Sequence, residues 1–182
     1  MVMQDSLGVA LDAALFSNTA GDATRPPGLL VGVSPISAAS GGGSAAMTKD
    51  ISALVAAVSP VCGLDLVFVA DPATATKIKM AVFPAFDFDV LASNSVAANT
   101  LIAVGLPALV SAFGETPRID ASRDVESAVS MDTVPPTDIA GGGGTVVKSS
   151  YQTDSVAIRF IADVAWAART ASAVAYVPSI TW

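Results

Sequence analysis

Asp87 and Asp89 are the two residues whose type and spacing come closest to a chemical site in this sequence. They alternate with Phe86, Phe88 and Val90, which predicts a strand with both acids on one face. Paired carboxylates can do acid–base work or hold a divalent cation. The same alternation is typical of a solvated strand face, and we favour that interpretation. The sequence therefore predicts no catalytic residue and no metal here, and a small carboxylate- or metal-dependent enzyme stays as the alternative.

The remaining reactive side chains indicate no other catalytic chemistry. The sequence has no histidine, which excludes Ser-His-Asp and Cys-His catalysis and removes the commonest general base. Its one cysteine, Cys62, lies beside Pro60 and Gly63 with no basic neighbour, so we expect a buried, inert thiol. A single cysteine cannot form an internal disulfide, which favours a cytosolic protein.

Two glycine-rich stretches and two lysines complete the candidates. Residues 41–43 and 141–144 match neither the P-loop nor the dinucleotide-binding spacing, and flexible linkers are the better interpretation. Lys77 and Lys79 are expected on an exposed helix face, because a catalytic lysine would need burial or a second cation. We therefore expect no cofactor.

The charge pattern argues against nucleic-acid and membrane partners. The net charge is −7, from 16 acidic and 9 basic residues that are scattered along the chain, so no basic patch is present for phosphates. No apolar stretch reaches about 18 residues, the length that a membrane-spanning helix needs. The first residues enter a helical pattern without a lead-in, which suggests a chain cut from something longer.

The elements that must position these residues form an α+β pattern. Three helices are predicted. The first covers residues 5–16, and the second runs from Thr48 as its N-cap to a stop at Ser59–Pro60. The third starts at Asp71–Pro72 and ends near residue 83. Extended segments are predicted at 29–31, 64–70, 86–90, 100–104, 118–125 and 173–177, and residues 107–113 could be a helix or a strand. Residues 134–144 are predicted to be irregular.

The strongest pattern runs from Val156 to Trp166, where apolar residues recur at period two. A helix is the competing interpretation, because it would pair Arg159 with Asp163 at i,i+4. We favour the strand, since a helix would spread the apolar residues around its surface. Trp166 and Trp182 are expected either to fill a sparse core or to anchor an interface.

Four segments together resemble one family of structural proteins. They are 10–30, 67–75, 86–120 (in three pieces) and 152–182 (in three pieces), with Val67-Phe-Val-Ala-Asp-Pro-Ala-Thr-Ala75 and Gln152-Thr-Asp-Ser-Val-Ala-Ile-Arg159 among them. In order and spacing they resemble the carboxy-terminal portion of tailed-bacteriophage major capsid proteins of the Hong-Kong-ninety-seven-like fold. The similarity is closest to prophage capsid proteins made as fusions with an upstream head-maturation protease.

The resemblance implies a phage major capsid fold with an axial domain at 28–144 and part of a peripheral domain at 1–27 and 145–182. The family's amino-terminal arm, extended loop and first part of the spine helix have no counterpart here. The implied function is self-assembly into an icosahedral head, through pentamers and hexamers and with other head proteins. Arg159, Asp163 and Trp166 become candidate subunit contacts.

Further expectations follow from the resemblance. The protein would lie in the virion capsid, and in the bacterial cytoplasm before assembly. We expect no Lys–Asn crosslink and no enzyme activity, and monomers or small rings rather than shells from this portion alone. Besides the metal-dependent enzyme, a binding module that decorates another assembly stays as an alternative.

Overall fold

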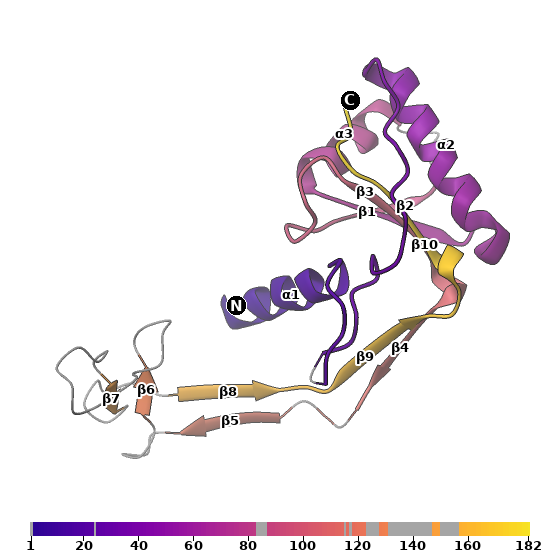
Figure 1. Cartoon of the computed structure of the whole chain (residues 1–182). Helices are drawn as coiled ribbons and strands as arrows, with labels where there is room; N and C mark the ends of the chain where they lie inside the picture. Colours follow the sequence, from indigo (N-terminus) through magenta and orange to yellow (C-terminus); the bar gives the residue numbers. More distant parts are fainter. Residues whose placement is uncertain are drawn as a thin grey trace. The chain divides into compact units, whose positions relative to one another are not determined.

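The computed structural model describes residues 2–23, 25–82, 87–114, 116, 118–122, 128–130, 147–149 and 157–182. The chain forms two compact units, one of Met1–Ala112 with Ala165–Trp182 and the other of Phe113–Val164. Helices and strands alternate through the first unit, as the sequence predicts (Figure 1).

A four-stranded sheet is the framework of the first unit, in the order β10-β3-β1-β2. Its strands are β1 (Leu66–Ala70), β2 (Asp89–Ala92), β3 (Leu101–Gly105) and β10 (Val174–Val177). β3 runs antiparallel to both β1 and β10, whereas β2 runs parallel to β1. Every residue of β3 is buried, which explains why this strand has a continuous apolar run instead of an alternating pattern.

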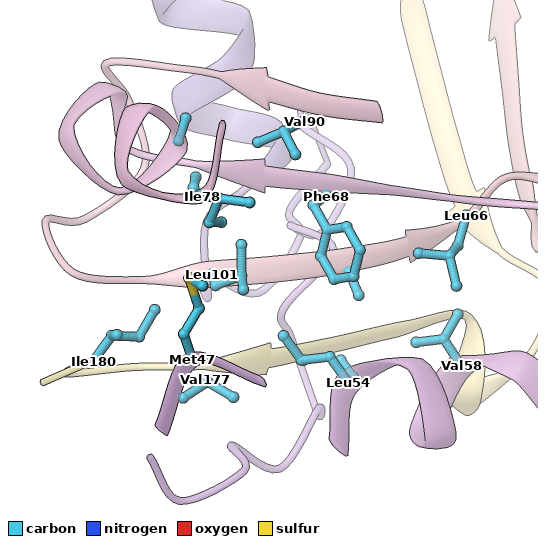
Figure 2. Close-up of a cluster of buried hydrophobic side chains, with 14 residues drawn as sticks. Met47, Leu54, Val58, Leu66, Phe68, Ile78, Val90, Leu101, Val177 and Ile180 are labelled. Carbon is cyan, nitrogen blue, oxygen red and sulfur yellow. The ribbon is translucent and has the colours of Figure 1, made fainter. Parts of the chain in front are cut away.

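The two faces of the sheet carry separate apolar clusters. Alternate residues supply them: Phe68 belongs to one cluster and its neighbour Val69 to the other. Helices α2 (Gly43–Cys62) and α3 (Pro72–Val82) cover the Phe68 face, and Figure 2 shows their side chains gathered with those of the strands. The labelled members are Met47, Leu54, Val58, Leu66, Phe68, Ile78, Val90, Leu101, Val177 and Ile180.

The second cluster uses the turn after helix α1 (Val2–Leu15). Leu29 and Leu30 are buried there with Val69, Ile102 and Val174. The prediction of an extended segment at 29–31 is wrong, because residues 29–32 form a turn. The two leucines pack on the sheet without adding a strand to it.

The start of α3 follows the predicted chemistry. Asp71 precedes the helix, and its carboxylate accepts hydrogen bonds from the N–H of Thr74 at 3.3 Å and of Asn99 at 3.1 Å. Pro72 occupies the first helical position, where its missing N–H costs nothing. The predicted Asp71 cap is therefore confirmed, and the same side chain also holds the loop before β3.

The predicted bounds of α2 are wrong at both ends. The helix begins at Gly43, so Thr48 lies inside it, where its hydroxyl donates to the carbonyl of Ser44 at 2.9 Å. It also continues through Pro60 to Cys62 and ends where Gly63, at φ 64°, donates its N–H to the carbonyl of Ser59 at 2.8 Å. A proline this close to the end interrupts only the last turn of hydrogen bonds.

α2 is also long and apolar enough to cross a membrane, with 20 residues and a mean hydropathy of 1.3 over its best window. Its buried residues Met47, Leu54 and Val58 belong to the cluster on the Phe68 face of the sheet. One third (33%) of that window is buried, and the core helix of a globular protein can pass the same length and hydropathy test.

Two-stranded ribbons lead out of and back to the sheet. After the 3-10 turn η1 (Leu106–Ala108), β4 (Leu109–Phe113) pairs with β9 (Val164–Ala168). In the second unit, β5 (Arg118–Ser122) pairs antiparallel with β8 (Ala157–Ile161), and β6 (Ala128–Ser130) pairs with β7 (Val147–Ser149). The 3-10 turn η2 (Ala171–Ala173) then precedes β10.

The closing pattern is confirmed as strand from Ala157 onward, but it is not one strand. β8 and β9 are separated at Ala162 and Asp163, and each pairs with a different partner. A period of two therefore predicted the conformation correctly without revealing the break. Val156 and the segment 134–144 lie outside the described residues.

Candidate interaction surfaces

The Asp87–Asp89 pair faces solvent. Both aspartates are exposed, while Phe88 between them is half-buried and Val90 is buried. The ring of Phe88 meets Phe68 edge to face, with centroids 5.7 Å apart. Exposure thus alternates over 87–90 as predicted, but the strand begins only at Asp89, so the predicted strand bounds of 86–90 are wrong and Asp87 precedes β2. Among the described residues no three His, Cys, Asp or Glu side chains gather as a metal site would require, so the pair has no further acidic ligand there.

Cys62 is half-buried at the end of α2. Its thiol donates to the carbonyl of Val58 at 3.4 Å. Burial raises the pKa of the Cys62 thiol, and the nearby charge of Asp65 raises it further. Since the thiolate is the nucleophile, this environment disfavours reaction.

Arg159 and Asp163, two of the three candidate contact residues, lie in the second unit. Arg159 is opposite Asp120 in the register of β5 and β8. Asp163 is exposed between β8 and β9, and its carbonyl accepts the N–H of Gly114 at 2.9 Å. A side chain at 114 would place a Cβ 2.9 Å from that of Asp163, so the glycine permits this close approach. Arg159 lies in β8 and Asp163 follows the end of that strand, so the two residues do not form the helical pair of the competing interpretation.

Trp166, the third candidate, lies in the first unit and is already used within the chain. It is half-buried against the second cluster, and its indole N–H donates to the carbonyl of Pro27 at 2.9 Å. Trp182 likewise donates its indole N–H to the carboxylate of Asp50 at 2.8 Å. Both tryptophans therefore stabilise the fold, and a role for Trp166 between subunits stays a prediction.

An apolar hollow, which sequence reasoning missed, lies at the start of α2. It has a volume of about 370 Å³ and is lined by Gly43, Ser44, Met47, Lys77, Met80, Ala81 and Trp182. We call it the Met groove. Lys77 donates to the backbone carbonyl of Trp182 at 2.9 Å, and the Met80 side chain is 80% exposed. The spacing of Lys77, Met80 and Ala81 predicts a shared helix face, but nothing local links it to Met47 or Trp182.

A second apolar surface follows the other end of α2. Leu64 is 72% exposed and Leu106 is also exposed. The carbonyl of Asp65, the residue after Leu64, accepts the N–H of Leu106 at 3.1 Å, which holds the two segments side by side.

The ribbon of the second unit also exposes large apolar side chains. Phe113 is 71% exposed and Ile119 is 67% exposed. Nearby, Arg118 donates to the carboxylate of Asp120 at 2.8 Å on the surface. A two-stranded ribbon is marginally stable in water by itself.

Comparisons with known proteins give a fold and no sequence relative. No family model matches the chain, and no curated protein matches its sequence. Among solved structures, a protein of Mycobacterium phage Adephagia matches with a TM-score of 0.61 at 15% identity, over 98% of this chain and 63% of the other. The capsid of a native GTA particle matches with a TM-score of 0.60 at 13% identity, over 98% of this chain and 63% of the other. A virus-like particle from Pyrococcus furiosus matches with a TM-score of 0.52 at 11% identity, over 82% of this chain and 57% of the other.

The chain thus has the mixed helix-and-sheet fold of phage major capsid proteins, as its sequence predicted. It spans 57–63% of the length of these three chains. At such identities the likeness concerns the fold alone, and the activity needs a separate argument.

Proposed function

We propose that this protein is a shell subunit of a tailed-phage or prophage head, which self-assembles with copies of itself into an icosahedral capsid. The observation that carries the proposal is the likeness of fold to the capsid of a native GTA particle, over 98% of this chain, and to a virus-like particle, over 82%. The chain has a structural role in this proposal and catalyses no reaction.

The exposed apolar residues support a role in assembly. Each of four side chains, Phe113 of β4, Ile119 of β5, Met80 of α3 and Leu64 after α2, leaves most of its surface in water. Burying such a side chain at an interface contributes about 1.5–3 kcal/mol. Several weak contacts of this size on different faces are what a subunit with many neighbours requires.

The finer features of the resemblance belong to the same proposal. In it, residues 28–144 form the axial domain, residues 1–27 and 145–182 belong to the peripheral domain, and Arg159, Asp163 and Trp166 contact neighbouring subunits. The assembled forms are pentamers and hexamers with other head proteins, in the virion and, before assembly, in the bacterial cytoplasm. The gene is proposed to encode an upstream protease fused to the capsid portion, which sequencing of the upstream reading frame tests.

Electron microscopy tests the shell function. The complete gene product that carries this sequence is expressed in bacteria, and the material that sediments as particles is imaged. Closed shells of uniform diameter containing this sequence are expected. A product that is recovered only as monomers over all concentrations would contradict the proposal.

The same material separates the two alternatives. A metal-dependent enzyme with Asp87 and Asp89 as ligands would release or absorb heat on titration with Mg²⁺, Mn²⁺ or Ca²⁺, and a shell subunit is expected to give no such signal at that pair. A decorating module would bind preformed heads without forming shells. Asp87→Asn/Asp89→Asn is the matched variant, and it should assemble like the wild type.

A further inference from the structure

We propose that residues 179–182 form a strap that can leave its site while the rest of the first unit stays folded. The strap follows β10 and belongs to no helix or strand. Its last residue, Trp182, is bonded to both α2 and α3. The proposal concerns bonds within one copy of the chain, so it does not depend on the shell function.

Side chains, rather than a strand ladder, hold the strap in place. The Trp182 indole N–H donates to the carboxylate of Asp50 in α2 at 2.8 Å, and the Lys77 ammonium of α3 donates to a backbone oxygen of Trp182 at 2.9 Å. The Thr181 hydroxyl donates to the carbonyl of Ala39 at 3.1 Å. Because β10 ends before the strap, release breaks none of the bonds between β10 and β3.

Two residues with positive φ meet where the strap begins. Ser179 and Asn99 both have a φ of 56°. The N–H of Ile180 donates to the carbonyl of Asn99 at 2.9 Å, so one bond joins these two places. Both residues carry a Cβ, which disfavours the left-handed region, and their surroundings must therefore hold them there. When the strap leaves, Ser179 can return to an ordinary φ, and this relief offsets part of the loss of the bonds.

Most of the core remains when the strap leaves. Ile180 is the one buried residue of the strap, 6% exposed, and Figure 2 shows it at one end of the cluster on the Phe68 face. Trp182 is half-buried against the same cluster. All other buried members of this cluster belong to α2, α3 or the sheet. Segments with few buried contacts open at a lower free energy than the core does, and the strap is such a segment.

Release would change what α2 and α3 share. In the closed strap, Trp182 connects Asp50 of α2 to Lys77 of α3, and the Asp50 side chain is 2% exposed. Without the strap this connection is lost. One oxygen of Asp50 keeps the N–H of Ala39, at 2.7 Å, and the other becomes available to water. The strap is therefore a latch between two helices and the cover of a buried carboxylate.

Hydrogen exchange followed by nuclear magnetic resonance tests the release. The Ile180 amide and the Trp182 indole N–H report on the strap, and the amides of β3, whose residues are all buried, report on the folded unit. We expect the strap hydrogens to be at least about a hundredfold less protected than the slowest amides of β3. Their exchange should hardly change in dilute urea, because a small opening exposes little surface, whereas exchange in β3 should accelerate.

A core variant on the other face of the sheet separates release from unfolding. Ile102 of β3 is 1% exposed and belongs to the second cluster. Ile102→Val should lower the protection of the β3 amides by about two- to tenfold. It should leave the protection of the strap unchanged, because release does not expose the second cluster. A strap that opens only when the whole unit unfolds would instead lose protection by the same factor as β3.

A lysine variant tests whether the strap opens as one piece. Lys77→Ala removes the bond from α3 to Trp182, and it should lower the protection of the Ile180 amide by about two- to tenfold, although Lys77 is bonded to a different residue of the strap. Lys79→Ala, at an exposed position of the same helix, is the matched control and should leave that protection unchanged.

Any one of three results would overturn the proposal: strap hydrogens that exchange as slowly as those of β3, an equal loss of protection in strap and β3 for Ile102→Val, or an Ile180 amide that Lys77→Ala leaves unchanged. Strap hydrogens without any protection would also overturn it, because the closed strap would then not form. None of these results bears on the shell function, which is scored on assembled particles.

Discussion

Replacing Asp50 by asparagine is expected to destabilise the first unit strongly for so small a change. The side chain is 2% exposed, and its two oxygens accept from two different donors, the N–H of Ala39 at 2.7 Å and the indole N–H of Trp182 at 2.8 Å. Asparagine offers one acceptor oxygen and an NH₂ group. One of the two donors must then face another donor in a buried site.

The magnitude follows from these bonds. A hydrogen bond to a charged group contributes about 1.5–3 kcal/mol, and leaving a buried donor unsatisfied costs a similar amount. Asp50→Asn should therefore lower the free energy of unfolding by about 2–3 kcal/mol, against a total of roughly 5–15 kcal/mol. For a chain of this size the melting temperature should fall by roughly 4–12 °C.

A double-mutant cycle makes the reasoning specific. Trp182→Phe removes the indole donor, and in the Asp50→Asn background it also removes the conflict between the two donors. It should therefore cost at least about 1 kcal/mol less there than in the wild type. Urea unfolding followed by far-ultraviolet circular dichroism measures all four proteins. Asp87→Asn makes the same charge change at an exposed position and should stay within about 0.5 kcal/mol of the wild type. The account would be refuted if the free energy of unfolding of Asp50→Asn were equally close to that of the wild type, or if the effects of Asp50→Asn and Trp182→Phe on it were strictly additive.

Three further predictions concern the core, a helix cap and the thiol. Leu54→Ala should cost about 2–5 kcal/mol in urea unfolding, because Leu54 is fully buried between α2 and the sheet, whereas Leu91→Ala, at a 55% exposed position, should cost less than about 1 kcal/mol. Partial burial by itself raises the pKa of Asp71, but hydrogen bonds from Thr74, Asn99 and Ala73 outweigh it and hold that pKa below the ordinary 3.8. The contribution of Asp71 to the free energy of unfolding is therefore complete above pH 3.8 and is lost as the pH falls through the lowered pKa of the folded state. Wild type and Asp71→Ala should thus differ in this free energy by about 1–2 kcal/mol at pH 7 and converge in acid. Because the pKa of Cys62 is raised, its reaction with a disulfide reagent at pH 8 should be slower in the folded chain than in urea, and equal rates would contradict that environment.

The sequence predicted best where the signal is local. Asp71–Pro72 combines an N-cap with a first-turn proline, and the structure places both as expected. The alternation of apolar and acidic residues placed both aspartates in solvent, although the strand itself begins only at Asp89. Period two likewise predicted the strands at 157–161 and 164–168.

The failures have long-range causes. Pro60 is a strong local stop signal, but the packing of α2 on the sheet, with Val58 fully buried, holds the helix together through it. Leu29 and Leu30 look like a strand because both are apolar, yet they fill the second cluster from a turn. No local pattern could show that β10 pairs with β3, about 70 residues earlier in the chain.

The interaction surfaces were the hardest features to predict. The Met groove brings together the start of α2, the middle of α3 and Trp182, and Lys77 is 105 positions from the residue to which it donates. The sequence singled out Lys77 and Trp182 separately, but only the fold makes them neighbours. Arg159, Asp163 and Trp166 were chosen from one pattern, and the structure divides them between two units.

The charge of the chain sets the conditions under which such surfaces can act. Each copy carries a net charge of −7, so two copies repel each other at long range, over about 30 Å in 0.01 M salt. At physiological ionic strength this range falls to about 8 Å, so only charges that lie close to an interface then oppose or favour association. Self-association of this chain should therefore be stronger at physiological ionic strength than in 0.01 M salt.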